Sequence, residues 1–407
     1  MARIAMFGMM LFAFPLSSTM AQNSNVTQGV VSLTPKESRT LADYYKGKSD
    51  EASVLDKIVR DAEKAMQKEP APLARIITSG ASVKTGKASN SKEAEEESGN
   101  IYTLALAYAI TGKEVYFEKA SHYLLSWAQV NQPEGDSVAE VKFVPMIRAY
   151  DLIRNRLAPA DRERIDHWMI GVGRAVLAYQ EEARAKNSPR GINNHRSHAL
   201  LIIAVIGCAI GEQNFIHYVT DKSGFLDHIG ENLATFTNEP PGAGVDYHER
   251  KAYHYVAYNL QALGQLAIVL DRMRHLSNNP YGITYNPYTI EVKGVSPVKT
   301  LRLLLPYATG EKRNMTEFEG TDNKNDLKRL ENGSLHREFN RKDAIPALEA
   351  ANYFFLTVPD PTTVHSYNLT EITTDILIEE KGRLSLPRAY PTPAFLVNRV
   401  TSPYLSR

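Results

Sequence analysis

Cysteine is almost absent from this sequence. The 407 residues contain only one, Cys208, so no disulfide can form within the chain and its stability must come from a packed core. Cys208 lies inside a strongly apolar run at residues 199–210 (ALLIIAVIGCAI). A thiol in such surroundings is expected to be packed and inert rather than a nucleophile.

An excess of charge of one sign is also lacking. The formal net charge is +1, with 23% charged and 43% apolar residues, which are ordinary values for a globular protein. This balance excludes the overall electrostatic signature of a nucleic-acid-binding or membrane-surface protein. An anionic ligand must therefore meet a locally positive site, and we expect no nucleic-acid or membrane partner. The oligomeric state is left open.

Apolar stretches long enough to span a bilayer are missing as well, since about 20 residues are needed. The N-terminus instead has Arg3, an apolar segment at residues 4–14 and small residues up to Ala21, which is typical of an export signal. We therefore predict that residues 1–21 are a signal peptide and that the mature protein is secreted or periplasmic. An uncleaved anchor is the alternative, but the apolar segment is too short for it.

The sequence does contain a long series of helical patterns. Apolar residues recur at three- and four-residue spacings in segments 100–111 and 114–131, which a Gly112-Lys113 turn joins into an expected helical hairpin. Such pairs recur without a fixed short repeat, which predicts an all-α fold: an incomplete α/α toroid or barrel of antiparallel helix pairs. We expect it to span residues 22–358, with residues 359–407 as a less regular C-terminal tail packing on it. The further helical segments are 141–156, 159–185, 199–211, 214–237, 247–278, 296–310 and 344–358.

One interruption of this pattern is rich in Ser, Gly, Lys and Glu. Residues 78–99 have almost no large apolar side chains, so an exposed loop is expected there. Lys84 and Lys87 in this segment could bind an anionic ligand, the alternative being that they are ordinary solvated charges.

Three polar residues stand directly before the apolar run. Asn193, Asn194 and His195 would each cost about 1–3 kcal/mol if buried without a partner. We therefore expect them at the mouth of a buried helix, aimed into a cavity. Asn is favoured at helix N-caps, which is a sufficient explanation for Asn193.

Histidine is concentrated in one part of the chain, which raises the question of a metal site. Six of the eleven histidines lie between residues 195 and 254. His248-Glu249 resembles the start of a zincin box, but the next histidine, His254, is six positions on and leaves the same helical face. No acidic residue has ligand spacing to His195, so we predict no metal and no organic cofactor.

A second polar segment, residues 246–259 (DYHERKAYHYVAYN), precedes a stripe of leucines and is expected to form the first turns of a long helix. Asn, His, Arg and Tyr at two helix mouths suit β-elimination on a 4-linked uronic acid. An amide and a guanidinium would hold the carboxylate and stabilise the enolate-like charge. A neutral His or a Tyr would remove the C5 proton, and a Tyr hydroxyl would protonate O4.

These residues resemble a known family. An Asn-Asn-His segment before an apolar helix, followed roughly sixty residues later by ERKAYHYVAYNLQAL, is similar to the alginate lyase superfamily of helical-toroid polysaccharide lyases. That group includes family 5 alginate lyases and family 38 enzymes acting on alginate or glucuronan. The resemblance covers roughly residues 75–275 and includes LAYAITGKEVYFEKASHYLLSWAQVNQP. It implies that Asn194 neutralises the carboxylate, that His195 neutralises it or acts as base, that Arg250 is a second neutraliser and that Tyr255 is the acid or combined acid and base.

The second segment departs from the family pattern. Family 5 enzymes are closer to Arg-x-x-Arg-Ala-Leu-x-Tyr-His-Asn, whereas here the Arg-to-Tyr spacing is shorter. Tyr253, Tyr258, His248 and His254 therefore remain candidate substrate-binding residues and rivals for the acid role. The family 5 lid signature is not matched in residues 78–92, so the substrate preference does not transfer.

The sequence thus predicts a polysaccharide lyase that cleaves a 4-linked uronic-acid polymer, alginate or glucuronan-like, and leaves a 4,5-unsaturated end. A helical-barrel glycoside hydrolase is the alternative enzyme, but it needs two facing carboxyl groups, and Asp246 and Glu249 are the conspicuous acids near the site. A non-catalytic protein that binds acidic polysaccharides is the third possibility.

Overall fold

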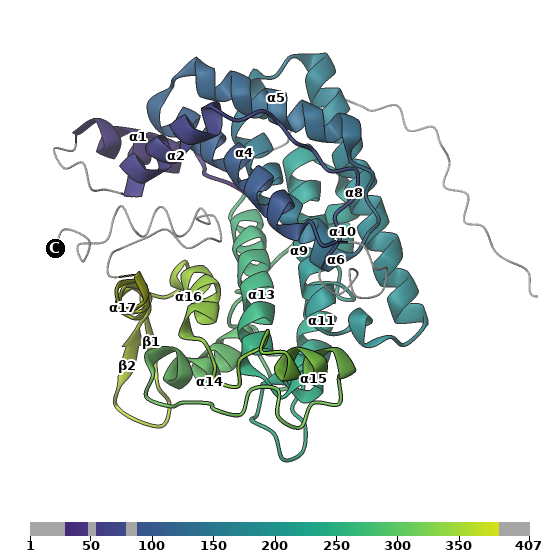
Figure 1. Cartoon of the computed structure of the whole chain (residues 1–407), viewed down its shortest axis with the longest axis vertical. Coiled ribbons are helices and arrows are strands. Elements are labelled where there is room, and N and C mark those ends of the chain that lie inside the picture. The colour runs from purple at the N-terminus through teal and green to yellow at the C-terminus, as the bar shows by residue number, and fades with distance from the viewer. Residues whose placement is uncertain (1–28, 48–53, 79–87, 382–407) are drawn as a thin grey trace, which may run out of the picture.

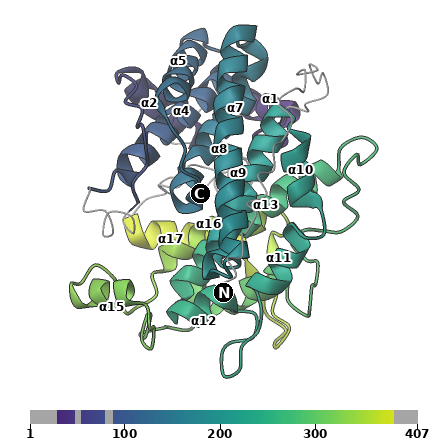
Figure 2. The same cartoon turned by 90° about the vertical axis from the view of Figure 1, so that its right-hand side faces the viewer.

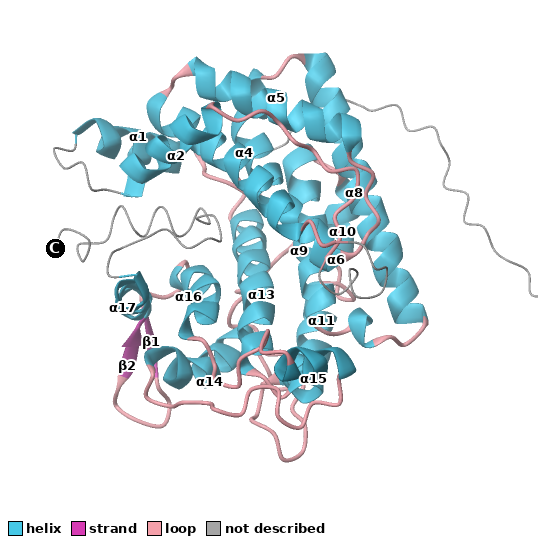
Figure 3. Ribbon diagram, in the orientation of Figure 1, coloured by secondary structure: helices cyan, strands magenta, loops and turns pink. Residues whose placement is uncertain are grey.

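A computed structural model describes residues 29–47, 54–78 and 88–381, and nearly all regular structure in these ranges is helical (Figure 3). The predicted signal peptide at 1–21, Lys84, Lys87 and the last 26 residues lie outside the described ranges. The larger helices are α1 (Pro35–Gly47), α2 (Val54–Met66), α4 (Ser91–Thr111), α5 (Glu114–Val130), α7 (Val144–Ile153), α8 (Pro159–Ala185), α9 (Asn194–Ile210), α10 (Gln213–Thr220), α11 (Phe225–Asn232), α13 (Tyr253–Arg274), α14 (Pro297–Thr309), α16 (Ile345–Asn352) and α17 (Leu369–Lys381).

Shorter elements join these helices. A two-stranded antiparallel hairpin precedes α17, with Val358 opposite Tyr367. No helix in the described ranges is both long and apolar enough to cross a membrane. The short elements are α6 (Ser137–Glu140), η1 (Val141–Phe143), η2 (Arg154–Arg156), η3 (Pro189–Gly191), α12 (Gly244–Arg250), α15 (Lys324–Glu331), η4 (Arg341–Ala344), β1 (Thr357–Pro359) and β2 (Ser366–Asn368).

Helices pack in a curved row that runs from α2 through α4, α7, α9, α13 and α16 to α17. In Figure 1, α13 stands in the middle, with α4 and α5 above it, α16 and α17 to its left, and α14 and α15 below. α5 packs on α4 and α8, and both α8 and α10 pack on α9, so these three helices cover one side of the row. The predicted all-α fold, an incomplete toroid of helix pairs, is confirmed.

Two features of the sequence produce the most buried parts of the row. Gly112 takes φ +71° and its N–H donates to the carbonyl of Tyr108, which ends α4 and lets α5 turn back as predicted. Every residue of α9 except His195 and Ile210 is buried, as expected of a helix that is apolar on all sides. Cys208 is among them, in contact with the sulfur of Met273, and burial raises the pKa of its thiol.

The prediction of an exposed loop over residues 78–99 is wrong for its second half. α4 begins at Ser91, and Glu97, Ser98 and Gly99 are buried. Lys, Glu and Ala in this stretch are good helix formers, and the Glu97 carboxylate accepts hydrogen bonds from the Ala71 N–H (2.9 Å) and the Trp127 indole (3.3 Å). A polar segment is therefore buried because its acid has partners from elsewhere in the fold.

The prediction of one long helix starting near residue 246 is also wrong. Lys251 takes a left-handed conformation (φ +53°) and separates α12 from α13. The first turn of α13 is completed from outside, because the buried Glu317 carboxylate accepts from the N–H groups of Tyr253 (2.8 Å) and His254 (3.0 Å). This break decides how α13 is rotated, and so which tyrosines face α9.

The two ends of the described chain are held against the body in different ways. Near the N-terminus, Asp151 accepts from the Gly29 N–H (3.0 Å) and the Ser32 hydroxyl, and Arg272 donates to the Gly29 carbonyl (2.8 Å). At the other end, α16, the hairpin and α17 form a second apolar cluster with α14 and the start of α13. The described part of the tail thus joins the body through this second cluster.

Candidate active site

The start of α9 is fixed by its own asparagines. The Asn193 side chain caps the helix by accepting from the His195 N–H (3.1 Å), as predicted, and its amide donates to Glu249 (3.2 Å). Asn194 donates its backbone N–H (3.2 Å) and its side-chain amide to the buried carboxylate of Asp246 on α12. The mouth of α9 is therefore tied to α12, which brings together the two polar segments found in the sequence.

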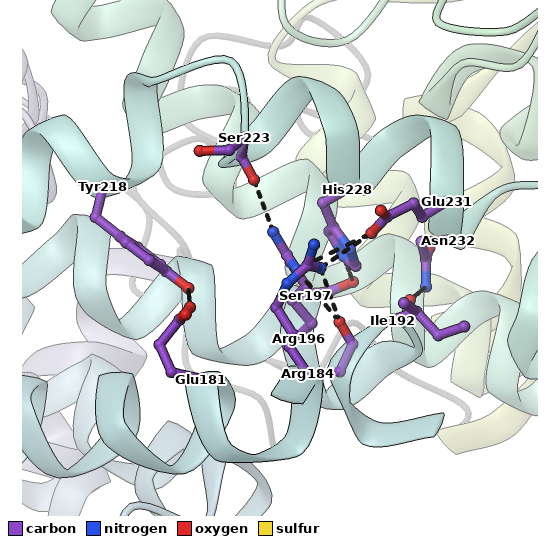
Figure 4. Close-up of polar contacts among 11 residues, drawn as sticks. Glu181, Arg184, Ile192, Arg196, Ser197, Tyr218, Ser223, His228, Glu231 and Asn232 are labelled. Atoms are coloured by element: carbon purple, nitrogen blue, oxygen red, sulfur yellow. Dashed lines mark hydrogen bonds and ion pairs between the residues drawn. The ribbon is translucent and has the colours of Figure 1, made fainter. Parts of the chain in front are cut away.

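Arginines hold the backbone that leads into this helix (Figure 4). The Gly191 carbonyl accepts from both Arg184 and Arg196 (3.4 Å each), and Arg184 also pairs with Glu231 of α11 (3.0 Å). The Arg196 guanidinium donates further to the carbonyl of Ser223 (2.8 Å). Two buried or half-buried cations thus fix the turn from which Asn194 and His195 project.

A directed chain of buried hydrogen bonds runs from this turn into the core. The Asn232 amide nitrogen donates to the Ile192 carbonyl (2.9 Å), because a carbonyl can only accept. The Asn232 side-chain oxygen must therefore face Asn259, and it accepts a hydrogen bond from the Asn259 amide (2.6 Å). The Asn259 oxygen then accepts from the Ser197 hydroxyl (2.6 Å), which leaves Ser197 to accept from Nε2 of His228 (2.7 Å). One carbonyl therefore dictates two amide orientations and one histidine tautomer.

The sequence analysis did not predict this series of hydrogen bonds, although the sequence contains an indication of it. Asn232, Ser197 and Asn259 are buried, and two of them interrupt otherwise apolar helices. A buried polar group without a partner is costly, so such interruptions indicate a network even when the partners are unknown. Asp246 belongs to the same network because Asn232 also approaches its second oxygen (3.4 Å), and burial raises the pKa of Asp246 to about 7.

His195 lies at the accessible edge of α9. Its side chain is 17% exposed, and Nδ1 is 3.9 Å from the carboxylate of Asp136, which also caps α6. One turn further on, the buried ring of His198 packs on the ring of Tyr258 from α13, with centroids 4.4 Å apart. This ring pair is where α9 and α13 meet beside the site.

Burial gives His198 a pH-dependent effect on stability that can be measured. Burial lowers the pKa of His198 to about 3, and the nearby charges of His195 and Lys142 make smaller contributions in the same direction. A histidine in the unfolded chain titrates near 6.5. Between these values unfolding takes up a proton, so the free energy of unfolding falls as the pH is lowered from 6.5. We expect His198→Phe to remove this contribution. Between pH 6.5 and 4.5 the free energy of unfolding should then fall by about 2 kcal/mol more in the wild type than in the variant.

Denaturant unfolding of both proteins at the two pH values checks this expectation. Carboxyl groups whose pKa values are raised by burial, among them Glu140, Asp151 and Asp246, act in the opposite direction. They are present in both proteins and cancel in the difference. An equal decrease in the free energy of unfolding of the two proteins would show that His198 is already charged in the folded state at pH 4.5.

Two tyrosines of α13 face this region with available hydroxyl groups. Tyr255 and Tyr258 are half-buried neighbours with ring centroids 6.4 Å apart. Neither hydroxyl makes a hydrogen bond to another described residue. Burial raises the pKa of both hydroxyls. Nearby Arg250 and Arg329 lower the pKa of Tyr255 while Asp326 and Asp246 raise it, whereas Tyr255, Glu95, Asp136 and Asp246 all raise the pKa of Tyr258 further.

Arg250 reaches the same place from the end of α12. Its guanidinium lies over the ring of Tyr255, 4.6 Å from the centroid, and pairs with the buried carboxylate of Asp326 on α15. The side chain is 21% exposed. Of its five N–H donors, only one is used in the bond to Asp326, so others remain for a ligand.

Of the remaining predicted residues, Tyr253 and His248 make their contacts elsewhere, and His254 borders this place. Tyr253 is buried in the second cluster, where its hydroxyl donates to Tyr307 (3.0 Å) and its ring stacks on the same residue. His254 is bonded to Asp343 (2.7 Å), and its ring meets that of Tyr255 edge-on, with centroids 5.3 Å apart. His248 is exposed, stacks on Phe236 and is bonded to Glu239 (3.0 Å).

The structure thus assembles Asn194, His195, Arg250, Tyr255 and Tyr258 around the junction of α9, α12 and α13. Asp136, Glu95 and Lys142 border it from α6, α4 and η1; Lys142 pairs with Glu95. No three His, Cys, Asp or Glu side chains converge as metal ligands within the described ranges. The cluster contains an amide, a guanidinium, an imidazole and two phenols, which can bind a carboxylate and move protons beside it.

Solved structures with the same fold are enzymes that act on a polysaccharide. An alginate lyase from Bacteroides ovatus superposes with a TM-score of 0.54 at 16% identity, covering 78% of this chain and 90% of that one. A histidine-to-alanine variant of alginate lyase A1-III, complexed with a tetrasaccharide, gives 0.51 at 15% identity, with 82% and 94% covered. A tyrosine-to-phenylalanine variant with the same ligand gives 0.50 at 15% identity, with 86% and 98% covered; A1-III comes from Sphingomonas species A1.

These likenesses show the fold. No curated protein matches the chain by sequence. The family model for alginate lyase matches residues 40–281, which is more than half of the chain. The protein is therefore a polysaccharide lyase, and the chain belongs to the alginate lyase family.

Proposed function

We propose that this lyase cleaves a 4-linked uronic-acid polymer, alginate or a glucuronan-like chain, by β-elimination at the junction of α9, α12 and α13. One observation carries the proposal. His198, one turn after His195, packs on Tyr258; Tyr258 is a neighbour of Tyr255, and Arg250 lies on the ring of Tyr255, so an unbroken series of contacts links the start of α9 to Arg250. The tetrasaccharide bound to A1-III variants is consistent with an oligosaccharide at this place.

The carboxylate of the cleaved uronate binds to Asn194 and Arg250 in this proposal. The Asn194 amide gives one hydrogen to Asp246 and keeps a second for the substrate. Arg250 contributes the donors that Asp326 leaves unused. Both groups stabilise the additional negative charge that develops on the carboxylate when the C5 proton departs.

Proton transfer is assigned to His195 and Tyr255. Neutral His195 takes the C5 proton, the C5–H electron pair forms the C4–C5 double bond, and the bond from C4 to the bridging oxygen breaks. The Tyr255 hydroxyl gives its proton to that oxygen, which becomes the new hydroxyl of the leaving chain. Tyr255 is preferred over Tyr258 because Arg250 lies on its ring and stabilises its phenolate, although Asp326 and Asp246 are also near. A phenolate at Tyr258 would face Asp136, Glu95 and Asp246 without a guanidinium on its ring.

The acids near the site fit a hydrolase less well. A hydrolase needs one carboxyl group on each side of the scissile bond. Asp246 and Glu249 instead both bind asparagines at the start of α9, and the Asp246 carboxylate is buried, so these two acids position the amides of the site. The two acids at its border also have structural partners, since Asp136 caps α6 and Glu95 pairs with Lys142.

The purified protein should be incubated with alginate, polymannuronate, polyguluronate, glucuronan, hyaluronan and pectate. We expect new ultraviolet absorbance from the C4–C5 double bond with at least one 4-linked uronan, in step with new reducing ends. Reducing ends without absorbance would identify a hydrolase. Binding of a uronan without either product would identify a binding protein, and each result would overturn the proposal.

A further inference from the structure

Helix α15 is attached to the protein in an unusual way. Its eight residues bury a single side chain, the carboxylate of Asp326, whereas Leu327 is 40% exposed. Surface helices of globular proteins normally dock through an apolar stripe. Figure 2 shows α15 at the outer edge of the molecule, beyond α12.

The anchor of α15 leads directly to the active site. Asp326 is 2% exposed and pairs with Arg250, which lies on the ring of Tyr255. Asn323 caps the helix by accepting from the N–H groups of Asn325 (3.0 Å) and Asp326 (3.3 Å). The capped helix is thus held at the rim of the site by an ion pair with one of the proposed substrate-binding groups.

The exposed surface of α15 carries a net positive charge, from two lysines and an arginine against a single exposed acid, Glu331. Lys324, Lys328 and Arg329 are exposed and have no ion-pair partner among the described residues. Most other cations close to the site are paired: Lys142 with Glu95, Lys251 with Glu239 and Arg250 with Asp326. Arg329, one helical turn after Asp326, lies close enough to lower the pKa of Tyr255.

We propose that α15 is an extended subsite that binds carboxylates of the uronic-acid units next to the one being cleaved. Arg329 faces the site and takes the first neighbouring carboxylate, while Lys324 and Lys328 on the outer face of α15 attract units further along the chain. This inference rests on the proposed function, because only an anionic polymer supplies a carboxylate on every unit. It explains why a helix without an apolar face is anchored at this position.

The subsite makes a prediction about chain length. A short substrate that fills only the cleavage position does not reach α15, whereas a polymer does. We expect Arg329→Gln to raise the KM for a long uronan about two- to fivefold, the range for one exposed ion pair. Neutralising Lys324, Lys328 and Arg329 together should raise it about tenfold or more. The KM for the shortest oligosaccharide that is cleaved should stay within about twofold.

The control is Lys36→Gln, which removes an exposed lysine from α1 at the opposite end of the molecule. It should leave the KM for the polymer unchanged. The effect of Arg329→Gln should also shrink at high salt, because exposed charges are screened there. Thermal unfolding of each variant confirms that the fold is intact.

The outcomes separate this inference from the function on which it rests. No unsaturated product from any uronan with the wild type would overturn the proposed function. Normal product formation with an unchanged polymer KM in the triple variant would overturn the subsite alone. An equal rise in KM for the shortest and the longest substrate would also overturn it, because Arg329 would then act at the cleavage position itself.

Discussion

The His195→Ala variant is expected to lose turnover on the uronan by about 10²- to 10⁴-fold, the usual contribution of a general base. The loss should appear in kcat, because the imidazole takes its proton in the transition state, while Asn194 and Arg250 continue to bind the carboxylate. Initial rates from ultraviolet absorbance, measured across substrate concentrations, give kcat and KM separately. The helix itself should remain intact, since the Asn193 cap uses the backbone N–H of residue 195 and not its side chain.

A matched control is available on α10. His217 is exposed and makes no ion pair with a described residue, and α10 packs on α9 away from the helix start. His217→Ala should retain wild-type rates. If His195→Ala also retained them, His195 would have no part in proton transfer, and the C5 proton would have to go to a tyrosine.

The Tyr255→Phe variant is expected to lose kcat by a similar factor, about 10²- to 10⁴-fold. The substitution removes only the hydroxyl, so the contacts of the ring with Arg250 and Phe318 are preserved. The leaving oxygen then departs without a proton donor. Steady-state rates and the unfolding temperature should be measured together, and the unfolding temperature is expected to change little.

Tyr258→Phe is the comparison that tests this assignment. Its ring contact with His198 is retained, and we expect a decrease in kcat of less than about tenfold. Tyr253→Phe should affect stability more than turnover, because its hydroxyl bonds to Tyr307 in the second cluster. A larger loss in Tyr258→Phe than in Tyr255→Phe would transfer the acid role to Tyr258.

The part of the site that could be predicted from sequence is the part built by local interactions. The Asn193 cap and the projection of Asn194 and His195 follow from residues within two positions of one another. The pattern of apolar residues likewise predicted the α4–α5 hairpin and the buried α9. Local rules succeed here because the capping group, the turn glycine and the apolar stripe lie in the segment that they shape.

The second half of the site depends on residues far away in sequence. The tyrosines presented by α13 are selected by the break at Lys251, and Glu317 completes the new helix start from more than sixty positions away. From the sequence alone, without knowledge of that carboxylate, α12 and α13 are predicted to be one helix. Tyr253 is then as good a candidate for the catalytic acid as Tyr255. Likewise, nothing near Arg250 in the sequence indicates that Asp326 binds it.

In the proposed mechanism, the pairing of Arg250 with Asp326 also affects how tightly the cleaved product is bound. A guanidinium whose charge is already balanced attracts a single carboxylate only weakly. It contributes more when a second unit of negative charge builds up on that carboxylate during proton removal. Binding that strengthens only in the transition state raises kcat rather than lowering KM. Release of the shortened chain should then be fast, because both product ends return to carboxylates of single charge.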